Sequence, residues 1–330
     1  MYSFSIIILN WNGIEHLKIF LPSVAASNYP EYEIILADNN SEDESVAWVN
    51  EHYPAIKIVR FDENYGYCKG NNKAAECVAG NIIVFLNNDV KVHPDWLRHV
   101  NDTFERFSGT AVVQPKLLSY KQPEYFEYAG AAGGMLDRLG YPWCRGRIFD
   151  RLEKDSGQYD EYPSKIFWAS GAAFCIKKDV FKNSGGFDEH FEFHMEEIDL
   201  CWRLQNKGYD IRYCPDAVVW HLGGGSLFKS DSKKTYFNFR NNLAMLTKNY
   251  PQGSLPGVLI LRFFLDFLAA LSFLLGGKVN HSNAVFKAYS HFYRKFSAWL
   301  KTRKEIDPPS TVNLAGFKPF SILWQKIFNK

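Results

Sequence analysis

The 330-residue sequence lacks the short motifs that mark the commonest zinc and nucleotide sites. Its six cysteines form no CxxC pair and no other metal-ligand spacing, which argues against a zinc site. No GxGxxG fingerprint follows the first predicted strand and no GxxxxGK(S/T) loop occurs, so a classical dinucleotide site and a P-loop are disfavoured. Cysteines scattered in this way are typical of a reducing compartment.

A surplus of one charge is also absent. The 38 Lys and Arg residues nearly balance the 36 Asp and Glu residues, and the net charge of +2 gives no indication of nucleic acid as a partner. No basic stretch with a small-residue cleavage site precedes the first apolar run, so no signal peptide is predicted. With 46% hydrophobic and 22% charged residues, the composition predicts a globular chain with a sizeable core.

The most informative stretch is an apolar run that ends abruptly in polar residues. Residues 82–86 are rich in β-formers and predict a strand buried on both faces. Asn87, Asn88 and Asp89 follow it, at the carboxyl end of a strand, where open α/β sheets bind ligands. Their side-chain oxygens suit Mg²⁺ or Mn²⁺. The alternative at this point is a polar turn in which Asp89 caps the next segment.

Other strands predicted in the first hundred residues lie at 5–9, 33–37 and 57–60, with helices at 15–26 and up to about residue 78. This alternation predicts a parallel sheet covered by helices. Two of these strands also end in polar residues, at 10–12 and 38–41. Because the carboxyl ends of parallel strands share one edge, these polar ends should surround one crevice with the 87–89 segment.

The residue types at this edge suit a nucleotide-linked ligand. The carboxylate of Asp38 can accept a hydrogen bond from a pyrimidine imide N–H or a ribose hydroxyl. Trp11 offers a ring on which a base can stack, and a metal ion on Asp89 can bridge a diphosphate.

A second group of polar residues follows position 168. A helix is predicted to open with Glu196, Glu197 and Asp199, which either favour the helix dipole or include a general base. His221 follows strands at 210–214 and 217–220. A lone histidine there is more often structural, but a histidine and a carboxylate at two strand ends also form a plausible metal pair. A strand is predicted at 112–118, and the stretch from 129 to 164 is predicted to be a variable or mobile loop.

These segments, in this order, resemble glycosyltransferase family 2, the inverting enzymes with the GT-A fold, and within it the rhamnosyltransferase-like enzymes of bacterial surface polysaccharides. The segments that carry the resemblance are 5–13, 33–43, 64–74, 82–90, 168–175, 185–203 and 215–226. The resemblance implies an α/β fold with a Rossmann-like, mixed but mainly parallel sheet, helices on both faces and a C-terminal helical extension. It implies a catalytic domain over 1–250, with a nucleotide-sugar half (1–100) and an acceptor half (101–250), followed by a helical region over 251–330.

The resemblance also implies roles for particular residues. The positions that match the family's nucleotide-sugar site are Leu9, Asn10, Trp11, Asp38, Asn40, Lys69, Asn71, Asn87 and Asn88. The positions that match its metal site are Asp89 and His221. The acidic positions expected to contain the catalytic base are Glu197, Glu196 and Asp199, and those expected to contact the acceptor are Trp168, Gly171 and Glu196.

This sequence departs from the family pattern at three of these positions. Asn87 replaces the first Asp of the metal motif, which lowers the negative charge there. Glu197 replaces the usual Asp of the acidic pair and is one methylene longer. Asn71 stands where many relatives have a basic residue, and Lys69 is the candidate to supply that charge.

The expected function is therefore an inverting, metal-dependent transfer of a sugar from dTDP-rhamnose or a UDP-sugar to a glycan or lipid-linked glycan acceptor. The alternative is a non-catalytic nucleotide-sugar or glycan-binding protein with a degraded site, which the two departures at Asn87 and Glu197 suggest. A nucleotidyltransferase is a third class, but residues 9–13 lack its glycine- and basic-rich triphosphate loop.

The last eighty residues begin with an apolar stretch over 258–275 that is long enough to span a bilayer. Arg262 and Asp266 interrupt it, and a charge at the centre of a spanning helix costs roughly 2.5–3.5 kcal/mol. We therefore favour a packed or interface-lying helix over a spanning one. The basic and aromatic residues that follow suit the anionic cytoplasmic leaflet. We expect a cytoplasmic protein with peripheral membrane contact at the inner face of the membrane, and a homodimer is compatible with this region.

Overall fold

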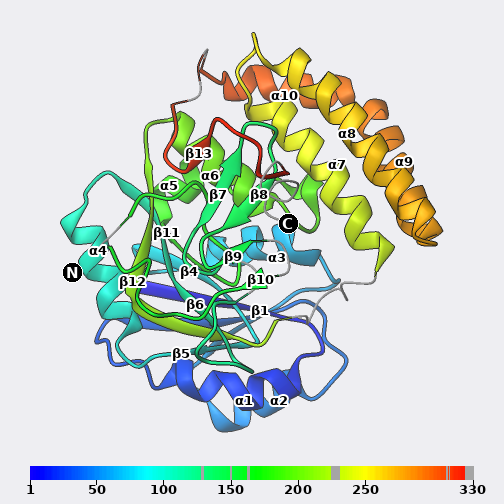
Figure 1. Cartoon of the computed structure of the whole chain (residues 1–330). Coiled ribbons are helices and arrows are strands. Elements are labelled where there is room, and N and C mark those ends of the chain that lie inside the picture. Colours follow the sequence, from blue (N-terminus) through cyan, green and yellow to red (C-terminus); the bar gives the residue numbers. More distant parts are fainter. Residues whose placement is uncertain are drawn as a thin grey trace.

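The computed structural model describes residues 1–127, 130–148, 151–161, 164–223, 231–309, 311 and 313–323. An eight-stranded mixed sheet forms its centre, with the strand order β3-β2-β1-β4-β11-β6-β12-β5 (Figure 1). The strands of this sheet are β1 (Phe4–Asn10), β2 (Tyr32–Asp38), β3 (Lys57–Arg60), β4 (Ile82–Asn87), β5 (Val90–Val92), β6 (Thr110–Ser119), β11 (Ala173–Lys177) and β12 (Asp210–His221).

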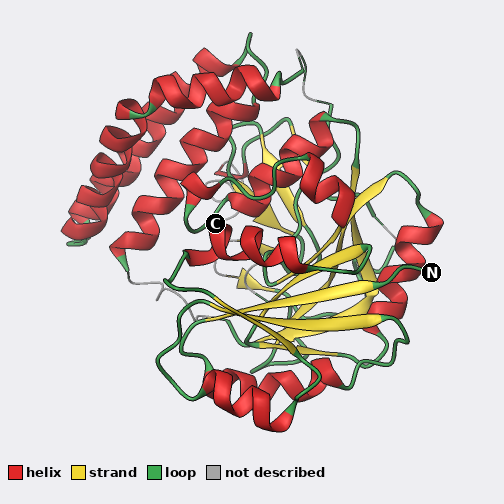
Figure 2. Cartoon of the chain, turned by 180° about the vertical axis from the view of Figure 1, so that it is seen from behind, coloured by secondary structure: helices red, strands yellow, loops and turns green. Residues whose placement is uncertain are grey.

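Helices cover both faces of this sheet (Figure 2). The helices in the described part of the chain are α1 (Ile14–Ala25), α2 (Ser45–His52), α3 (Gly66–Ala74), α4 (Trp96–Arg106), α5 (Lys178–Asn183), α6 (Glu196–Asn206), α7 (Ser232–Asn249), α8 (Leu255–Leu275), α9 (Val279–Arg294) and α10 (Phe296–Ile306), with short 3-10 turns η1 (Ala75–Cys77) and η2 (Glu189–Phe191). In β1, Ile6 and Ile8 pack toward α1 and α4, whereas Ile7 packs toward α3 and α6. Burial on both faces explains why this strand is a continuous apolar run.

The register of the sheet brings the predicted polar ends together. β1 pairs in parallel with β2 and β4, and the pairs at its carboxyl end are Asn10 with Asp38 and Leu9 with Asn87. The chain runs outward from β1 through β2 to β3 and then returns to the other side of β1 as β4. The strand order therefore reverses between β1 and β4, which is where open α/β sheets bind ligands.

The prediction of a loop over 129–164 was wrong for the described residues that form four short strands. These strands belong to a second, five-stranded sheet of β10 (Arg151–Leu152), β9 (Arg147–Ile148), β8 (Pro142–Cys144), β7 (Gly134–Asp137) and the distant β13 (Phe317–Lys318). Asp137 fixes the C-terminal segment on this sheet, because its carboxylate accepts hydrogen bonds from the Ser321 hydroxyl and the Ile322 amide. Gly316, at φ +71°, makes the close approach to Phe167 that precedes β13, and a Cβ at this position would lie 2.4 Å from the Phe167 nitrogen.

The four C-terminal helices pack beside the second sheet and α6, with α8 and α9 outermost (Figure 1). α8 has the length and composition of a membrane span, but it contains a buried ion pair between Arg262 and Asp266, one helical turn apart, and both residues bond to neighbouring elements. Arg262 also donates to the carbonyl of Leu139, and Asp266 accepts from the hydroxyls of Tyr141 and Tyr289. These contacts place the two charges predicted to interrupt the helix on its inner face.

Candidate functional site

A cavity of about 510 Å³ lies beyond the carboxyl ends of β1 and β4. Its walls come from the β1–α1 turn, α3, the β4–β5 turn, the segment before α6, the end of β12 and the start of α7. The lining residues are Leu9, Asn10, Trp11, Asn12, Gly13, His16, Asn39, Asn64, Gly66, Tyr67, Asn71, Phe85, Leu86, Asn87, Asn88, Asp89, Phe193, His194, His221 and Lys234.

The floor between β1 and β4 is fixed by side-chain amides. Asn10 is fully buried, and its Oδ1 accepts from Asn88 Nδ2 at 3.0 Å while its Nδ2 donates to Ser41 Oγ at 3.2 Å. Gly13 lies against this pair, and a Cβ there would stand 2.3 Å from both amide groups. A glycine is therefore required where the chain turns from β1 into α1.

Asp38 lies behind this floor rather than on it. It is fully buried, its Oδ2 accepts from the Ser41 amide at 3.2 Å, and its Oδ1 has no hydrogen-bond partner in the described part of the chain. Asn71 is also buried and lines the cavity, and its Nδ2 likewise lacks a partner among the described residues. Buried polar atoms are normally hydrogen-bonded, so Asn71, which faces the cavity, is suited to a ligand that completes it, whereas Asp38 does not line the cavity.

Asp89 and His221 meet at the end of the cavity formed by β4 and β12. His221 Nε2 lies 3.1 Å from Asp89 Oδ1, and its Nδ1 lies 3.4 Å from Glu127 Oε1. Burial alone would lower the pKa of His221, but the two carboxylates outweigh it and raise this pKa to about 10. Burial would raise the pKa of Asp89, but His221 outweighs it and keeps this pKa below its usual value. The predicted pair of Asp89 and His221 is therefore in direct contact. Glu127 is a third residue of this cluster, which the sequence analysis did not predict.

No group of three or more His, Cys, Asp or Glu side chains within the described ranges has the arrangement of a metal site. His221 can ligate a metal only after it loses the proton that its raised pKa retains, and Asp89 and His221 together supply two ligating residues, so a divalent cation here would need further oxygens from a bound ligand and water. Mg²⁺ commonly binds in this way, through one or two carboxylates and substrate phosphates. The donor set therefore fits a cation that arrives with a phosphate-bearing ligand.

A tightly held segment precedes α6 on another wall. Glu192, His194 and Met195 all have positive φ angles, between +61° and +73°, which is unusual for residues other than glycine. Asn241 on α7 stabilises this backbone, because its Nδ2 lies within 2.7–2.8 Å of three carbonyl oxygens, those of Phe191, Phe193 and His194. The two N–H donors of this buried amide, one of them shared between two of the carbonyl oxygens, hold the segment in its strained conformation.

His194 is presented to the cavity by this segment. Burial, and then the positive charge of Lys234, lower the pKa of His194 to about 4, so its imidazole is neutral at ordinary pH. Its Nε2 has no hydrogen-bond partner in the described structure. Sequence reasoning missed His194 and Lys234, because neither lies at the end of a predicted strand.

Glu196 and Glu197 open α6 next to the cavity but do not line it. Both are close to Tyr67, which does line it and whose pKa is raised by burial and then by these two carboxylates. Burial, together with the neighbouring carboxylate, raises the pKa of Glu196 well above its ordinary value. Burial raises the pKa of Glu197 to about 7. One oxygen of each carboxylate has no partner among the described residues.

Asp199, the third acidic residue of this helix, has a different environment. It is fully buried and pairs with Arg203 and Lys248, and Lys248 also contacts Asp188 at 2.6 Å. Asn249 donates to its second oxygen. The carboxylate is thus saturated by partners that join α6 to α7, which is a structural arrangement and leaves no oxygen for an acceptor.

Several further predicted residues lie outside the cavity walls. Trp168 is buried, with its indole N–H bonded to the carbonyl of Met135, so its ring belongs to the core and not to an open acceptor surface. The carbonyl of Gly171 accepts from the Tyr67 hydroxyl, which places this glycine behind the wall. Asn40 is an exposed turn residue at φ +63°, and Lys69 lies over the ring of Tyr65. By contrast, the indole of Trp11 is exposed at the cavity rim.

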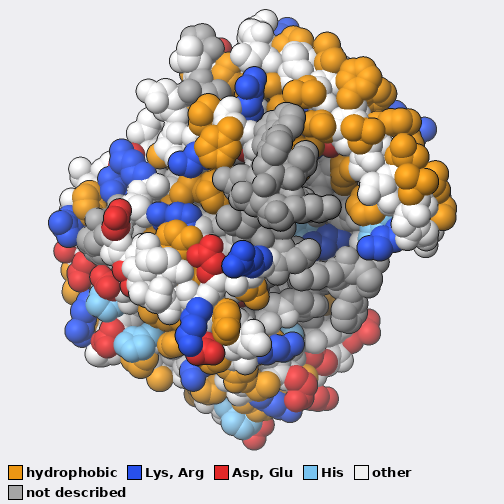
Figure 3. Space-filling model, viewed as in Figure 1, with side chains coloured by type: hydrophobic (Ala, Val, Ile, Leu, Met, Phe, Trp, Pro, Cys, Tyr) orange, Lys and Arg blue, Asp and Glu red, His pale blue; other side chains and the backbone are white. Residues whose placement is uncertain are grey.

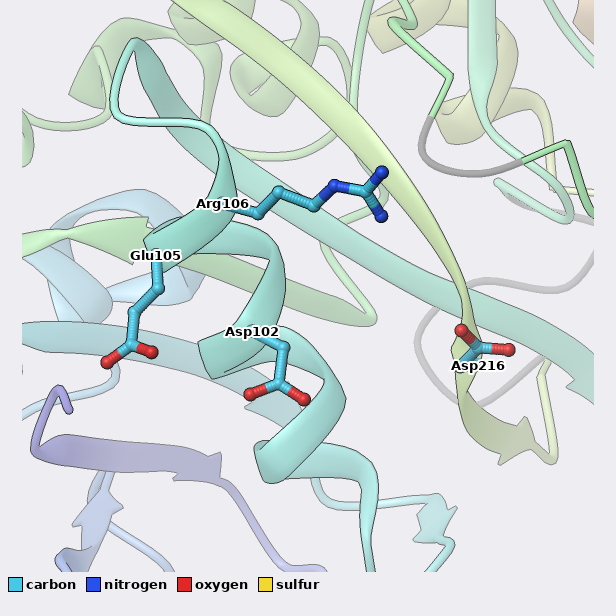
Figure 4. Close-up of a pocket in the computed structure, with 4 residues that line it drawn as sticks. All are labelled: Asp102, Glu105, Arg106 and Asp216. Atoms are coloured by element: carbon cyan, nitrogen blue, oxygen red, sulfur yellow. The ribbon is translucent and has the colours of Figure 1, made fainter.

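A second depression, between α4 and β12, is shown in Figure 4. It is lined by Asp102, Glu105, Arg106 and Asp216. Figure 4 shows that these four side chains diverge instead of meeting at one point. It is remote from the β1 and β4 ends and offers no chemistry that the cavity lacks.

Residues 5–182 match the model of the family described as glycosyl transferase family 2, which is more than half of the chain. The chain belongs to this family of glycosyltransferases, which transfer a sugar from a nucleotide-sugar donor. The chain is similar to N-acetylglucosaminyl-diphospho-decaprenol L-rhamnosyltransferase of Mycobacterium tuberculosis, with 26% identity over 224 residues, 62% of this chain and 71% of that protein. It is also 29% identical over 189 residues to the O-antigen biosynthesis protein RfbC of Myxococcus xanthus, which covers 56% of this chain and 14% of that one.

Solved structures confirm the GT-A type of fold. The fold is similar to that of GalNAc-T7 in complex with UDP, GalNAc and Mn²⁺, with a TM-score of 0.66 at 15% identity, over 94% of this chain and 55% of that one. TarS of S. aureus in complex with UDP-GlcNAc gives 0.57 at 15% identity, over 92% and 88% of the two chains. The expected mixed α/β fold with a mainly parallel sheet and C-terminal helices is therefore confirmed.

Proposed function

We propose that this chain is an inverting, metal-dependent glycosyltransferase that uses dTDP-rhamnose or a UDP-sugar and acts on a glycan or lipid-linked glycan in surface polysaccharide synthesis. The contact between Asp89 and His221 at the end of the cavity carries this proposal. The pair and the exposed ring of Trp11 line the same cavity, so one ligand can place a base on the ring and a diphosphate at the pair. The rhamnosyltransferase relative from M. tuberculosis supports the choice of donor and acceptor classes.

The nucleoside would occupy the β1 and β2 side of the cavity. Leu9 and Trp11 would contact the base, and Asn71 would donate from its unpaired Nδ2 to the base or ribose, while Asp38 would support this edge from behind through its bond with Ser41. Asn87, Asn88 and Asp89 would face the diphosphate. A divalent cation on Asp89 and His221 would neutralise diphosphate charge. In this arrangement, the residues at the carboxyl ends of β1 and β4 would each contact one part of a nucleoside diphosphate.

Glu197 would act as the general base. It would accept the proton of an acceptor hydroxyl while that oxygen attacks the anomeric carbon from the side opposite the diphosphate. The bond from that carbon to the diphosphate breaks, and its electron pair leaves with the nucleotide, so the configuration inverts. A carboxylate with a pKa of about 7 is matched to this task near neutral pH. Glu196, beside it, would bind the acceptor.

Titration calorimetry with UDP and with dTDP, each with and without Mn²⁺ or Mg²⁺, tests the proposal. We expect one diphosphate to bind more tightly when the metal is present, and Asp89→Asn to remove this metal-dependent gain. Asp102→Asn, in the remote depression, is the matched control and should bind like the unmodified chain. Failure of the folded chain to bind either diphosphate would contradict the proposal.

A second candidate function is a non-catalytic nucleotide-sugar or glycan-binding protein. It is favoured by Asn87, which puts an amide where the family has a first acidic residue. Release of the nucleotide from a UDP-sugar or dTDP-sugar in the presence of acceptor separates the two candidates. Metal-dependent binding without any turnover across such donors would favour the binding protein.

A further inference from the structure

The outer helices present an apolar face that no described residue covers. Only 22% of the most apolar window of α8 is buried, although its mean hydropathy is 2.3. The large exposed apolar side chains on α8 and α9 are Ile260, Leu261, Phe263, Phe264, Phe267, Leu268, Leu271, Leu274, Leu275, Val279, Phe286 and Tyr293. Figure 3 shows many hydrophobic side chains at the upper right of the molecule, where Figure 1 draws α8 and α9. Contiguous apolar patches of this kind mark interaction sites with proteins or membranes.

The inner face of α8 excludes a helix that leaves the domain to cross a bilayer. Arg262 and Asp266 are almost completely buried, and Arg262 also bonds to Asn242 and to the carbonyl of Leu139. A spanning α8 would break these bonds and expose both charges to hydrocarbon. The helix is therefore fixed with its charged face on the protein and its apolar face outward, which is the orientation of an interfacial helix.

The charge around this face favours an anionic surface. The segment 255–306 contains eight Lys and Arg residues and two acidic residues, although the whole chain has a net charge of only +2. Asp266, one of the two acids, is buried in its ion pair, whereas Lys278, Lys287 and Arg294 are exposed. A symmetric dimer through this face would bring two such basic segments together, and like charges repel. An anionic bilayer complements both the apolar centre and the basic surroundings.

The tip of the α8–α9 hairpin lies close to the candidate site. Lys234, at the start of α7, lines the cavity, and the next residue, Thr235, bonds through its hydroxyl to His281 Nδ1 at 2.8 Å. His281 is in the first turn of α9 and lies against the ring of Phe273 near the end of α8. The tip of the hairpin is thus two contacts away from the cavity wall.

We propose that the apolar face of α8 and α9 is a docking surface for an anionic membrane. The face lies in the interfacial region of the bilayer, with Phe263, Phe264 and Phe267 among the acyl chains and the basic side chains at the headgroups. Docking places the hairpin tip, and with it the cavity, at the membrane surface. The acceptor is then one that the bilayer presents, which rests on the proposed function. The docking itself does not depend on that function.

Flotation of the full chain with lipid vesicles tests the docking. We expect co-flotation with vesicles of phosphatidylglycerol and phosphatidylcholine, weaker association with phosphatidylcholine alone, and a decrease as salt is raised. Phe264 and Leu268 are 59% and 58% exposed, so their replacement disturbs no core contact. The Phe264→Glu/Leu268→Glu variant should lose about tenfold or more in vesicle partitioning, since it removes two apolar anchors and adds two negative charges.

Ile19→Glu is the matched control, because Ile19 is a 54% exposed apolar residue on α1, on the other side of the molecule. It should float like the unmodified chain. Diphosphate binding should be unchanged in both variants, which separates failure of docking from failure of the proposed function. Absence of vesicle association, or equal association of the double variant, would overturn the proposal. A concentration-dependent dimer that only the double variant abolishes, without vesicle binding, would instead assign this face to a second copy.

Discussion

Glu197 is placed where its surroundings determine the pH at which it can act. Burial raises its pKa to about 7, and a general base must be ionised. We therefore expect turnover to fall about tenfold per pH unit below about pH 7 and to level off above it. Initial rates between pH 5.5 and 8.5 with saturating metal would show this acidic limb.

Glu197→Gln should lower kcat by about 10²–10⁴-fold and remove the acidic limb, because the amide accepts no proton. Diphosphate binding by this variant serves as the control and should be unchanged. Near-normal turnover of Glu197→Gln would contradict the role of this residue as the base.

His194 offers a second prediction for one side chain. Its neutral imidazole has an Nε2 without a described partner, on the cavity wall. If this atom bonds to donor or acceptor, His194→Ala should raise the KM of that substrate by roughly 5- to 150-fold, the equivalent of one hydrogen bond of about 1–3 kcal/mol. The thermal midpoint should change little. His52→Ala, at an exposed histidine on α2, is the control, and equal kinetics of the two variants would remove His194 from the site.

At the scale of elements, α7 controls the segment that carries His194 and leads to Glu196. Asn241→Ala removes the donor that holds three carbonyl oxygens of this segment. We expect a loss of stability of about 1–3 kcal/mol and, in addition, a decrease in kcat that exceeds any change in donor affinity. Denaturant unfolding and steady-state kinetics measure the two effects separately.

Gln205→Ala provides the comparison for Asn241→Ala, because Gln205 is another buried amide that donates to a carbonyl, that of Phe167 on the opposite side of α6. It should lose stability without a selective loss of kcat. Equal kinetic effects in the two variants would show that Asn241 supports the fold alone.

The same elements show which parts of the structure the sequence could predict. Strands β1, β2 and β4 are apolar runs ended by polar residues, because burial on both faces and a ligand edge select this pattern. The residues at those ends, from Leu9 to Trp11 and from Asn87 to Asp89, line the cavity as predicted. The prediction succeeded where local sequence and position in the sheet are linked directly.

The second sheet was missed for physical reasons. Strands β8, β9 and β10 have two or three residues each, too few for an alternating pattern to emerge. Strand β13 pairs with β7 across about half of the chain, a contact that local sequence does not encode. Trp168 and Asp199 were assigned to the site by family position, yet their neighbours, Met135 and Lys248, come from distant segments and fix both residues in the interior.

At the scale of the whole molecule, the buried pair of Arg262 and Asp266 joins the outer helices to the rest of the chain. It links α8 to the turn after β7 through Leu139, to α7 through Asn242 and to α9 through Tyr289. The helical region predicted over 251–330 is therefore not an appendage but shares polar contacts with the catalytic part. Its outward face can be apolar because its charged face is satisfied by the protein.

Removal of one partner tests this connection. Arg262→Met leaves Asp266 buried without its cation, which should lower the free energy of unfolding by about 3–5 kcal/mol. Arg262→Met/Asp266→Leu should cost less than the single change, because no unpaired charge remains. Arg294→Met, at an exposed position of α9, should be near neutral. Urea unfolding monitored by fluorescence measures these changes in the free energy of unfolding. If Arg262→Met were as stable as Arg294→Met, α8 would be held by its apolar contacts alone and could leave the domain. A membrane-spanning α8 would then explain its apolar composition better.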